Sequence, residues 1–140
     1  MKPADLNIDR GFVEVRAEIA KTRKRRLVDL SDNCKAWLKV GAELPPRNTQ
    51  RRMNNVRIAS GMEGYQRKRV KGKDCWLHVP GEPWPHDAMR HSFGSYHVGM
   101  HGSADKTATQ MGHRSTDTLF RHYRELVTKE EAAKFWSIFP

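Results

Sequence analysis

The stretch WPHDAMRHSFGSYHVGMHG, residues 84–102, determines the character of the second half of the chain. At about 100° per residue, its apolar side chains form one helical stripe of Met89, Phe93, Tyr96 and Met100. This pattern predicts an amphipathic helix that is entered at residues 84–85, buries the stripe in a core, and frays near residues 99–102.

An adjoining stripe of the same helix carries polar residues at the boundary between core and exterior: His86, Arg90, His97 and His101. A guanidinium at such a boundary is held rigidly, still meets a ligand, and matches two phosphate oxygens at once. The alternative is a metal site, because His97 and His101 have the i, i+4 spacing of zinc ligands. No glutamate follows His97 as in the H-E-x-x-H motif, so we expect no metal and no other cofactor.

Three further helices are predicted downstream, and each has a start signal. The first ends at Gly112, and the second is TLFRHYRELV, residues 118–127. The third, EEAAKFWSIF, begins at the capping box TKEE, in which Glu131 reaches back to the cap. The predicted caps, in chain order, are Ser103 or Asp105, Ser115 or Asp117, and Thr128.

The first thirty residues predict β structure instead. Residues 5–9 and 11–19 alternate apolar with polar side chains around a turn at Asp9-Arg10-Gly11, and RLVDL at 26–30 is a third strand. KTRKR at 21–25 is interpreted as a tight basic hairpin tip. Ser31 then caps a short helix that carries Trp37 and Leu38. The predicted fold class is therefore α+β, mainly helical with a small N-terminal antiparallel sheet.

The charge balance indicates a polyanionic partner. The 140 residues include 26 Lys and Arg against 16 Asp and Glu, a formal net charge of +10, and basic side chains that replace phosphate counterions favour nucleic-acid binding. Residues 45–73 are especially basic, predicting a helix at 46–61 and a loop or irregular strand at 64–74. The alternative is a solvated basic face. The candidate DNA-contacting residues are Arg47, Arg51, Arg52, Arg67, Lys68 and Arg69.

Other sequence features limit the class of protein. The two cysteines, Cys34 and Cys75, lie far apart, which argues against a disulfide framework or a cysteine-based zinc site. There is no apolar run long enough for a membrane span and no signal-peptide pattern. We expect a soluble protein of the cytoplasm, associated with the nucleoid and not with membranes.

Three motifs in order resemble one family. MRHSFGSYH, then QMGH ending at His113, then HYREL with Tyr123 look like the C-terminal half of the catalytic domain of tyrosine recombinases (phage integrases). That family has an arginine in an R-H-[ST]-F helix, a G-H turn, and a nucleophilic tyrosine roughly ten residues later. Residues 7–30 resemble the family's β-hairpin, whose catalytic lysine lies at the tip, here Lys21.

The resemblance implies roles for individual residues. Tyr123 would be the nucleophile that forms a phosphotyrosyl link, and Arg90 and His113 would bind the phosphate, whose charge grows in the transition state. Lys21 would protonate the departing 5′ oxygen. Each residue has a structural alternative: Tyr123 shares a helix face with apolar residues and would pack in a core, His113 would close a turn, and Lys21 is one of five basic residues at 21–26.

The chain also departs from the family. The histidine expected three residues before Arg90 is replaced by Asp87, and His86 is the candidate substitute. The family's first arginine lies upstream of the first strand, where this sequence begins. We therefore expect residues 1–140 to be a partial catalytic domain, with a β-hairpin region at 1–30, a basic helix and loop region at 31–80 and a helical active-site region at 84–140, and we expect weak cleavage.

The resulting hypothesis is site-specific recombination or integration of double-stranded DNA, with the apolar C-terminal helix docking onto another protomer or onto its own core. A non-catalytic DNA-binding module is the alternative. An RNA-binding protein and a type IB topoisomerase are more distant alternatives, and no stacking motif of the RRM kind is present.

Overall fold

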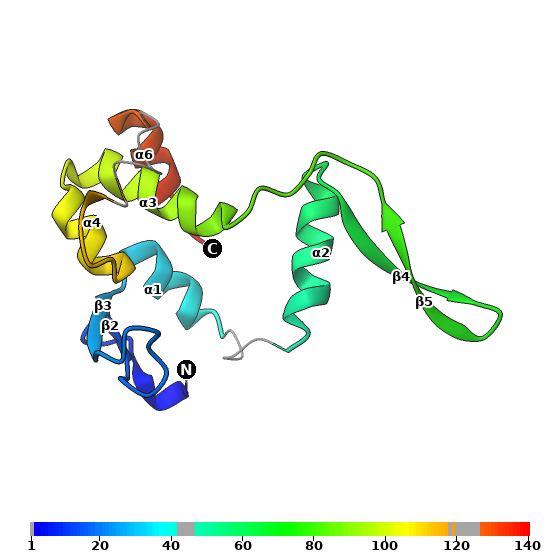
Figure 1. Ribbon diagram of the computed structural model, residues 1–140, viewed down its shortest axis with the longest axis horizontal. Coiled ribbons are helices and arrows are strands. Elements are labelled where there is room, and N and C mark those ends of the chain that lie inside the picture. Colours follow the sequence, from blue (N-terminus) through cyan, green and yellow to red (C-terminus); the bar gives the residue numbers. More distant parts are fainter. Residues whose placement is uncertain (1, 42–46, 118, 120–126) are drawn as a thin grey trace. The chain divides into compact units, whose positions relative to one another are not determined.

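The computed structural model describes residues 2–41, 47–117, 119 and 127–140 (Figure 1). The described part of the chain is α+β and contains five α-helices and two small antiparallel sheets, which confirms the predicted class. The chain divides into two compact units: the first comprises Met1–Pro45 and Met89–Pro140, and the second comprises Pro46–Ala88. None of the helices in the described residues is long and apolar enough to cross a membrane.

The sheet of the first unit has three strands in the order β1-β2-β3: Leu6–Asn7, Phe12–Val15 and Arg26–Asp29. Pairing of β2 with β3 runs from Phe12↔Asp29 to Val15↔Arg26. The predicted strand at 11–19 therefore ends early, and the tight hairpin tip at 21–25 is wrong. Residues 16–25 form a longer loop, whose backbone bonds internally and buries Ala20 (Ala20 N donates to Arg16 O, 3.1 Å).

Four helices complete the first unit: α1 (Asp32–Lys39), α3 (Ala88–His101), α4 (Ala104–Met111) and α6 (Lys129–Trp136). The predicted caps of α4 and α6 are confirmed. Ser103 Oγ accepts the Lys106 N–H (3.2 Å), and Thr128 and Glu131 form both bonds of the capping box. Ser31 stands at the N-cap of α1, but its hydroxyl bonds to Asn33 Oδ1 (2.6 Å) and makes no cap bond. Most of the predicted helix at 118–127 lies outside the described residues.

The core of the first unit is built from Ala108, Met111 and Leu119, with Phe93 and Ala104 packed against them. The predicted apolar stripe of α3 is therefore only partly correct, because Met89 and Met100 are 65% and 39% exposed. The buried face of α3 instead carries Gly94 and His97.

The packing of helix α6 explains why the buried face of α3 differs from the predicted apolar stripe. Phe135 stacks on Tyr96 with ring centroids 4.3 Å apart, and Trp136 meets Phe93 edge-on at 5.8 Å. Trp136 Nε1 also donates to the backbone oxygen of Tyr96 (3.2 Å). The C-terminal helix thus packs onto its own unit, covering α3 on the side of Phe93, Tyr96 and His97.

The second unit consists of α2 (Thr49–Ala59) and a hairpin of β4 (Gly64–Val70) and β5 (Lys73–Val79). The predicted helix is confirmed in a shorter form. Of the two alternatives predicted at 64–74, the strand is the nearer, but it is the regular strand β4 followed by a turn and the start of β5. Lys71 and Gly72 both have positive φ, +49° and +79°, as a type I′ hairpin turn requires. Helix α2 packs closely on β4, because a Cβ at Gly64 would lie 2.8 Å from Ile58 Cγ1.

Candidate active site

Two of the predicted site residues, Arg90 and His113, contact each other. Arg90 lies in the first turn of α3, and His113 follows the residue that ends α4. Arg90 Nη2 lies 2.5 Å from His113 Nε2 and donates to the Met111 backbone oxygen at 3.2 Å. Because a guanidinium only donates, this contact fits a neutral imidazole whose Nε2 carries a lone pair.

Gly112 sets the direction of His113. It ends α4 in the left-handed conformation (φ +70°), which glycine adopts without a Cβ penalty. A Cβ at this position would also lie 2.6 Å from Arg26 Cζ and would push the guanidinium aside. The guanidinium of Arg26 therefore lies directly against the turn that precedes His113.

Arg26 is a site residue that the sequence analysis missed. Along β3 the half-buried positions are Arg26 and Val28, while Leu27 is 47% exposed. From hydrophobicity alone, Leu27 would have been predicted to be the buried residue. Arg26 Nε is buried and has no hydrogen-bond partner among the described residues. The available sequence signal was the two-residue alternation of a strand, which places Arg26 on the same side as Val28.

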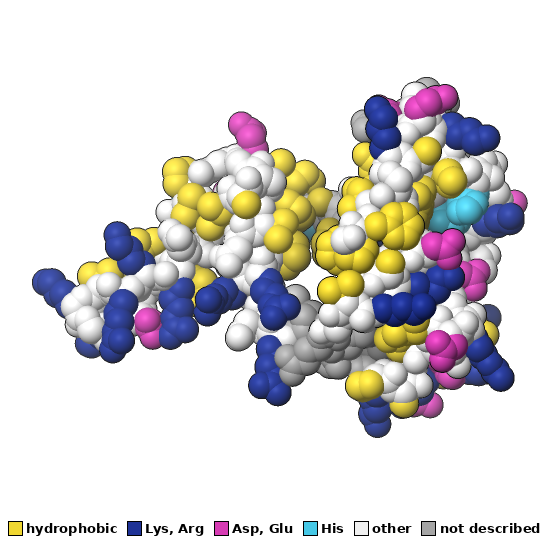
Figure 2. Space-filling view, turned by 180° about the vertical axis from the view of Figure 1, so that it is seen from behind, with side chains coloured by type: hydrophobic (Ala, Val, Ile, Leu, Met, Phe, Trp, Pro, Cys, Tyr) yellow, Lys and Arg dark blue, Asp and Glu magenta, His cyan; other side chains and the backbone are white. Residues whose placement is uncertain are grey.

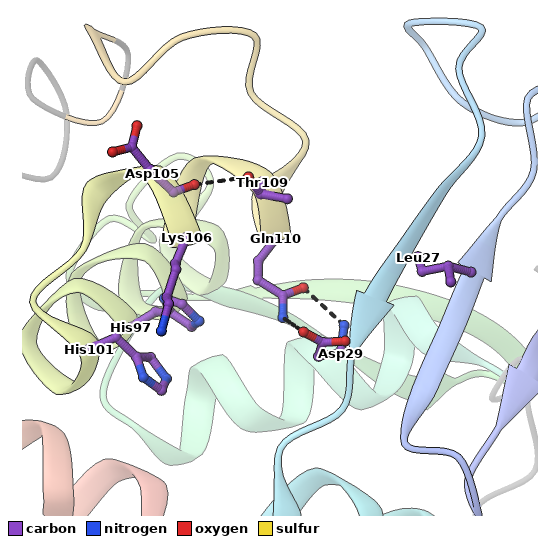
Figure 3. Close-up of a pocket in the computed structure, with 8 residues that line it drawn as sticks. All are labelled: Leu27, Asp29, His97, His101, Asp105, Lys106, Thr109 and Gln110. Atoms are coloured by element: carbon purple, nitrogen blue, oxygen red, sulfur yellow. Dashed lines mark hydrogen bonds between the residues drawn. The ribbon is translucent and has the colours of Figure 1, made fainter.

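A side-chain pair holds β3 against α4 (Figure 3). The Gln110 amide accepts the Asp29 N–H (3.0 Å) and donates to Asp29 Oδ2 (3.1 Å). Since Asp29 is in the same four-residue strand as Arg26, and Gln110 is two residues before Gly112, this pair fixes where the Arg26 guanidinium meets the α4 turn.

The Arg26 and His113 side chains line a basic pocket of about 500 Å³ within the first unit. One wall is the loop before β3, and the other is the C-terminal end of α4. Arg25 is partly neutralised by Glu14, whose carboxylate lies 2.5 Å away and raises the pKa of the Arg25 guanidinium. The remaining positive charge suits an anionic ligand. The lining residues are Thr22, Lys24, Arg25, Arg26, Thr109, Gly112, His113 and Arg114.

The other predicted catalytic residues have different placements. Lys21 is exposed on the same loop, and its neighbour Thr22 lines the pocket, but Lys21 does not. Tyr123 lies outside the described residues. His86 belongs to the second unit and its side chain is 94% exposed, with Asp87 Oδ2 3.7 Å away.

The interpretation of His86 as part of a helical stripe with Arg90 is wrong. Helix α3 begins at Ala88, and Asp87 has a left-handed backbone (φ +51°). The helical periodicity therefore does not extend back to His86.

His97, labelled in Figure 3, also differs from its prediction as a boundary residue, because it is buried. Its Nδ1 lies 2.7 Å from Thr107 Oγ1, and the Thr107 hydroxyl donates to the Ser103 backbone oxygen (2.9 Å). Because the Thr107 hydroxyl proton is used in the bond to Ser103, Thr107 Oγ1 acts as an acceptor toward His97, and His97 Nδ1–H is the donor. Among the described residues, no group of three or more His, Cys, Asp and Glu could hold a metal ion.

The candidate DNA-contacting residues all belong to the second unit and are exposed: Arg47, Arg51, Arg52, Arg67, Lys68 and Arg69. Figure 2 shows Lys and Arg side chains gathered over this unit. Both arginines of β4 are oriented by contacts within the hairpin. Arg67 pairs with Asp74, and Arg69 Nε donates to the Gly72 backbone oxygen (3.4 Å).

Comparisons of the chain with models of known families, with curated proteins and with solved structures found no match. A functional conclusion therefore depends on the residues of the site themselves.

Proposed function

We propose that the chain binds double-stranded DNA and breaks and rejoins a strand through a phosphotyrosyl intermediate, as tyrosine recombinases do in site-specific recombination or integration. The observation that carries the proposal is the Arg90–His113 contact beside a basic pocket bordered by the loop of Lys21. Residues from three separate parts of the sequence, which the resemblance assigns to one reaction centre, thus come from adjoining elements of one unit.

The chemistry of the pocket fits a phosphodiester. The Tyr123 hydroxyl loses its proton to solvent and attacks phosphorus, the bond from phosphorus to the 5′ oxygen breaks, and the 3′ phosphate stays on the tyrosine. Guanidinium groups stabilise the additional negative charge of the pentacoordinate transition state. Arg90 supplies one such group, and Arg26, half-buried at the pocket wall, supplies a second. Lys21 gives its proton to the departing oxygen, and attack by a 5′ hydroxyl reverses the reaction.

The decisive test is covalent trapping. A pool of duplexes, randomised around one bridging 5′ phosphorothiolate, is incubated with the full chain, and the adduct is detected on a denaturing gel. The sulfur leaving group cannot religate efficiently, so even a slow enzyme accumulates product. We expect an adduct with the wild type and none with Tyr123→Phe. The matched control is Tyr96→Phe, because Tyr96 is half-buried and already stacked on Phe135. An adduct that persists in Tyr123→Phe would refute the nucleophile assignment.

The same substrate tests the general acid. A thiolate leaves without protonation, so Lys21→Ala should form adduct normally on the phosphorothiolate while losing at least about a hundredfold on the ordinary phosphodiester. Lys24→Ala is the comparison from the same loop, since Lys24 lines the pocket. If Lys24→Ala shows this pattern and Lys21→Ala does not, the role of Lys21 is wrong.

A second candidate function is DNA binding without turnover. It is favoured by the position of the six candidate contact residues in a unit that contains neither Arg90 nor His113. Normal retention of duplex DNA with no adduct from the phosphorothiolate pool would select this function.

A further inference from the structure

The hairpin of the second unit has one face that combines aromatic rings with arginines. In an antiparallel pair, residues directly opposite each other point to the same side, and alternate residues share a side. The register pairs Arg67 with Trp76, Tyr65 with His78 and Arg69 with Asp74, so these side chains share one face. Lys68 and Leu77 point to the other face.

The two rings on this face are open to solvent. Tyr65 is 52% exposed and Trp76 is 53% exposed. Tyr65 leans on the His78 ring, with the centroids 5.4 Å apart and the planes tilted by 59°. Large aromatic side chains gain free energy when they are covered, so two of them held open on a short hairpin form a surface suited to a flat ligand.

Helix α2 provides a second wall. A groove of about 410 Å³ runs between α2 and the aromatic face of the hairpin, and its α2 side carries Arg51 and Asn55. Asp74, also at the groove, pairs with Arg67 and cancels one positive charge. Arg51 and Arg69 leave a net positive charge. We call this surface the aromatic groove and define it by Arg51, Asn55, Tyr65, Arg67, Arg69 and Trp76.

We propose that the aromatic groove binds a single-stranded segment of DNA, with bases stacked on Trp76 and Tyr65 and phosphates bound by Arg51 and Arg69. Aromatic platforms beside a basic groove bind unpaired strands because every base has a π face and every nucleotide a phosphate. Paired bases in an intact duplex are stacked on each other and cannot offer their faces. The choice of DNA rests on the proposed function, since a cut strand must unpair next to the cut before it can be joined to another strand.

Fluorescence anisotropy of the full chain tests this groove with four labelled probes of equal length: oligothymidylate dT12, an abasic 12-mer with the same phosphates, a 12-base-pair duplex and rU12. We expect dT12 to bind at least about fivefold more tightly than the abasic strand, as one stacked base provides. Equal affinity for the dT12 and abasic probes would overturn the stacking arrangement. Tighter binding of rU12 than of dT12 would overturn the choice of DNA.

Variants identify the groove. Trp76→Ala should weaken dT12 binding at least about fivefold and leave the abasic strand unchanged, whereas Trp76→Phe keeps a ring and most of the affinity. The matched control is Leu77→Ala, on the same strand but the opposite face and 42% exposed. Circular dichroism and the melting temperature verify folding. Equal losses in Trp76→Ala and Leu77→Ala, or a large loss in Trp76→Phe, would contradict the proposal.

The proposal for the groove and the proposal for cleavage can be refuted independently of each other. Tyr123→Phe should abolish the covalent adduct and leave dT12 affinity unchanged, while Trp76→Ala should weaken dT12 binding and still form adduct with the duplex pool. If wild type forms the adduct but binds dT12 and the abasic strand equally, only the proposal for the groove is refuted. If wild type forms no adduct but prefers dT12 to the abasic strand, only the proposal for cleavage is refuted.

Discussion

Among the described residues, the imidazole of His97 is a buried titratable group whose protonation is unfavourable in the folded chain. Burial, together with the smaller effects of the charges of His101 and Lys106, lowers the pKa of His97 from 6.5 to about 4, while Asp29 acts in the opposite direction. The folded chain therefore binds fewer protons at this site than the unfolded chain between these two pH values. The contribution of His97 to the free energy of unfolding is fully present above pH 6.5. It is lost as the pH falls toward the pKa of His97 in the folded chain.

We expect the free energy of unfolding to fall by up to about 3 kcal/mol from this residue alone between pH 7 and pH 4. Urea denaturation at several pH values measures it. His97→Gln, whose amide keeps a hydrogen-bond donor for Thr107, should remove this part of the pH dependence. His101→Gln is the control, because His101 is exposed and its loss should leave most of the slope. An unchanged slope in His97→Gln would contradict the assignment.

At this scale the sequence did not predict burial. The motif order assigned Arg90 and His113 to the same phosphate, and in the structure their side chains contact each other. The burial of His97 was not expected, because the helix alone cannot show which side α6 covers. Arg26 was missed for a related reason: an arginine in a short strand is interpreted as exposed unless the element packed on it is known.

The helices differ in how their first turns are satisfied. In α6, Thr128 Oγ1 accepts the Glu131 N–H (3.2 Å), and Glu131 Oε2 accepts the Thr128 N–H (2.9 Å). The backbone bond from Thr128 holds the pKa of the Glu131 carboxyl below its ordinary value. In α1, Ser31 occupies the same position without a cap bond. Two similar residues at helix starts thus have different energetic roles.

Thr128→Ala should lower the free energy of unfolding by about 1 kcal/mol, the usual cost of a lost N-cap. Ser31→Ala is the matched control and should cost less, since no cap bond is lost. Thermal and urea denaturation of both variants at pH 7 provide the comparison. A larger effect in Ser31→Ala would show that the hydroxyl bond to Asn33 matters more than the capping box.

Elements with a local signal were predicted well, and those without one were not. The capping box and Gly112 act through their own neighbours, so α4 and α6 could be located from the sequence. The hairpin at 64–79 was missed because both of its faces are largely exposed, and the alternation of apolar and polar residues that marks a half-buried strand is absent. Its turn, Lys71-Gly72, was the only local signal.

The two units are unequally stabilised. The buried apolar residues among the described positions all belong to the first unit: Ala20, Ala108, Met111, Leu119 and Ala132. In the second unit the buried positions are Asn54 and Gly64. Since apolar burial is the main source of stability, the second unit has less to hold it folded. The onset of the especially basic stretch at residue 45 nearly coincides with the start of the second unit at Pro46, but charge alone did not indicate a separate unit with little apolar burial.

Hydrogen exchange should therefore show weaker protection in α2 and the hairpin than in α4, because local opening costs less free energy where few apolar contacts are lost. Mass spectrometry of peptides covering 49–79 and 104–111 measures the difference. Adding dT12 should slow exchange in the hairpin and leave α4 unchanged. Uniform protection across both regions would mean that the chain unfolds as one cooperative body.

The pair of hydrogen bonds between Gln110 and Asp29 depends on the Gln110 amide having both a donor and an acceptor. A glutamate at position 110 would place two carboxylates against each other, and they could remain together only by sharing a proton. Deamidation of this one side chain would thus make the link between strand and helix depend on pH, stronger in acid and weaker at neutral pH, where the pairing of β3 with β2 would still hold Arg26.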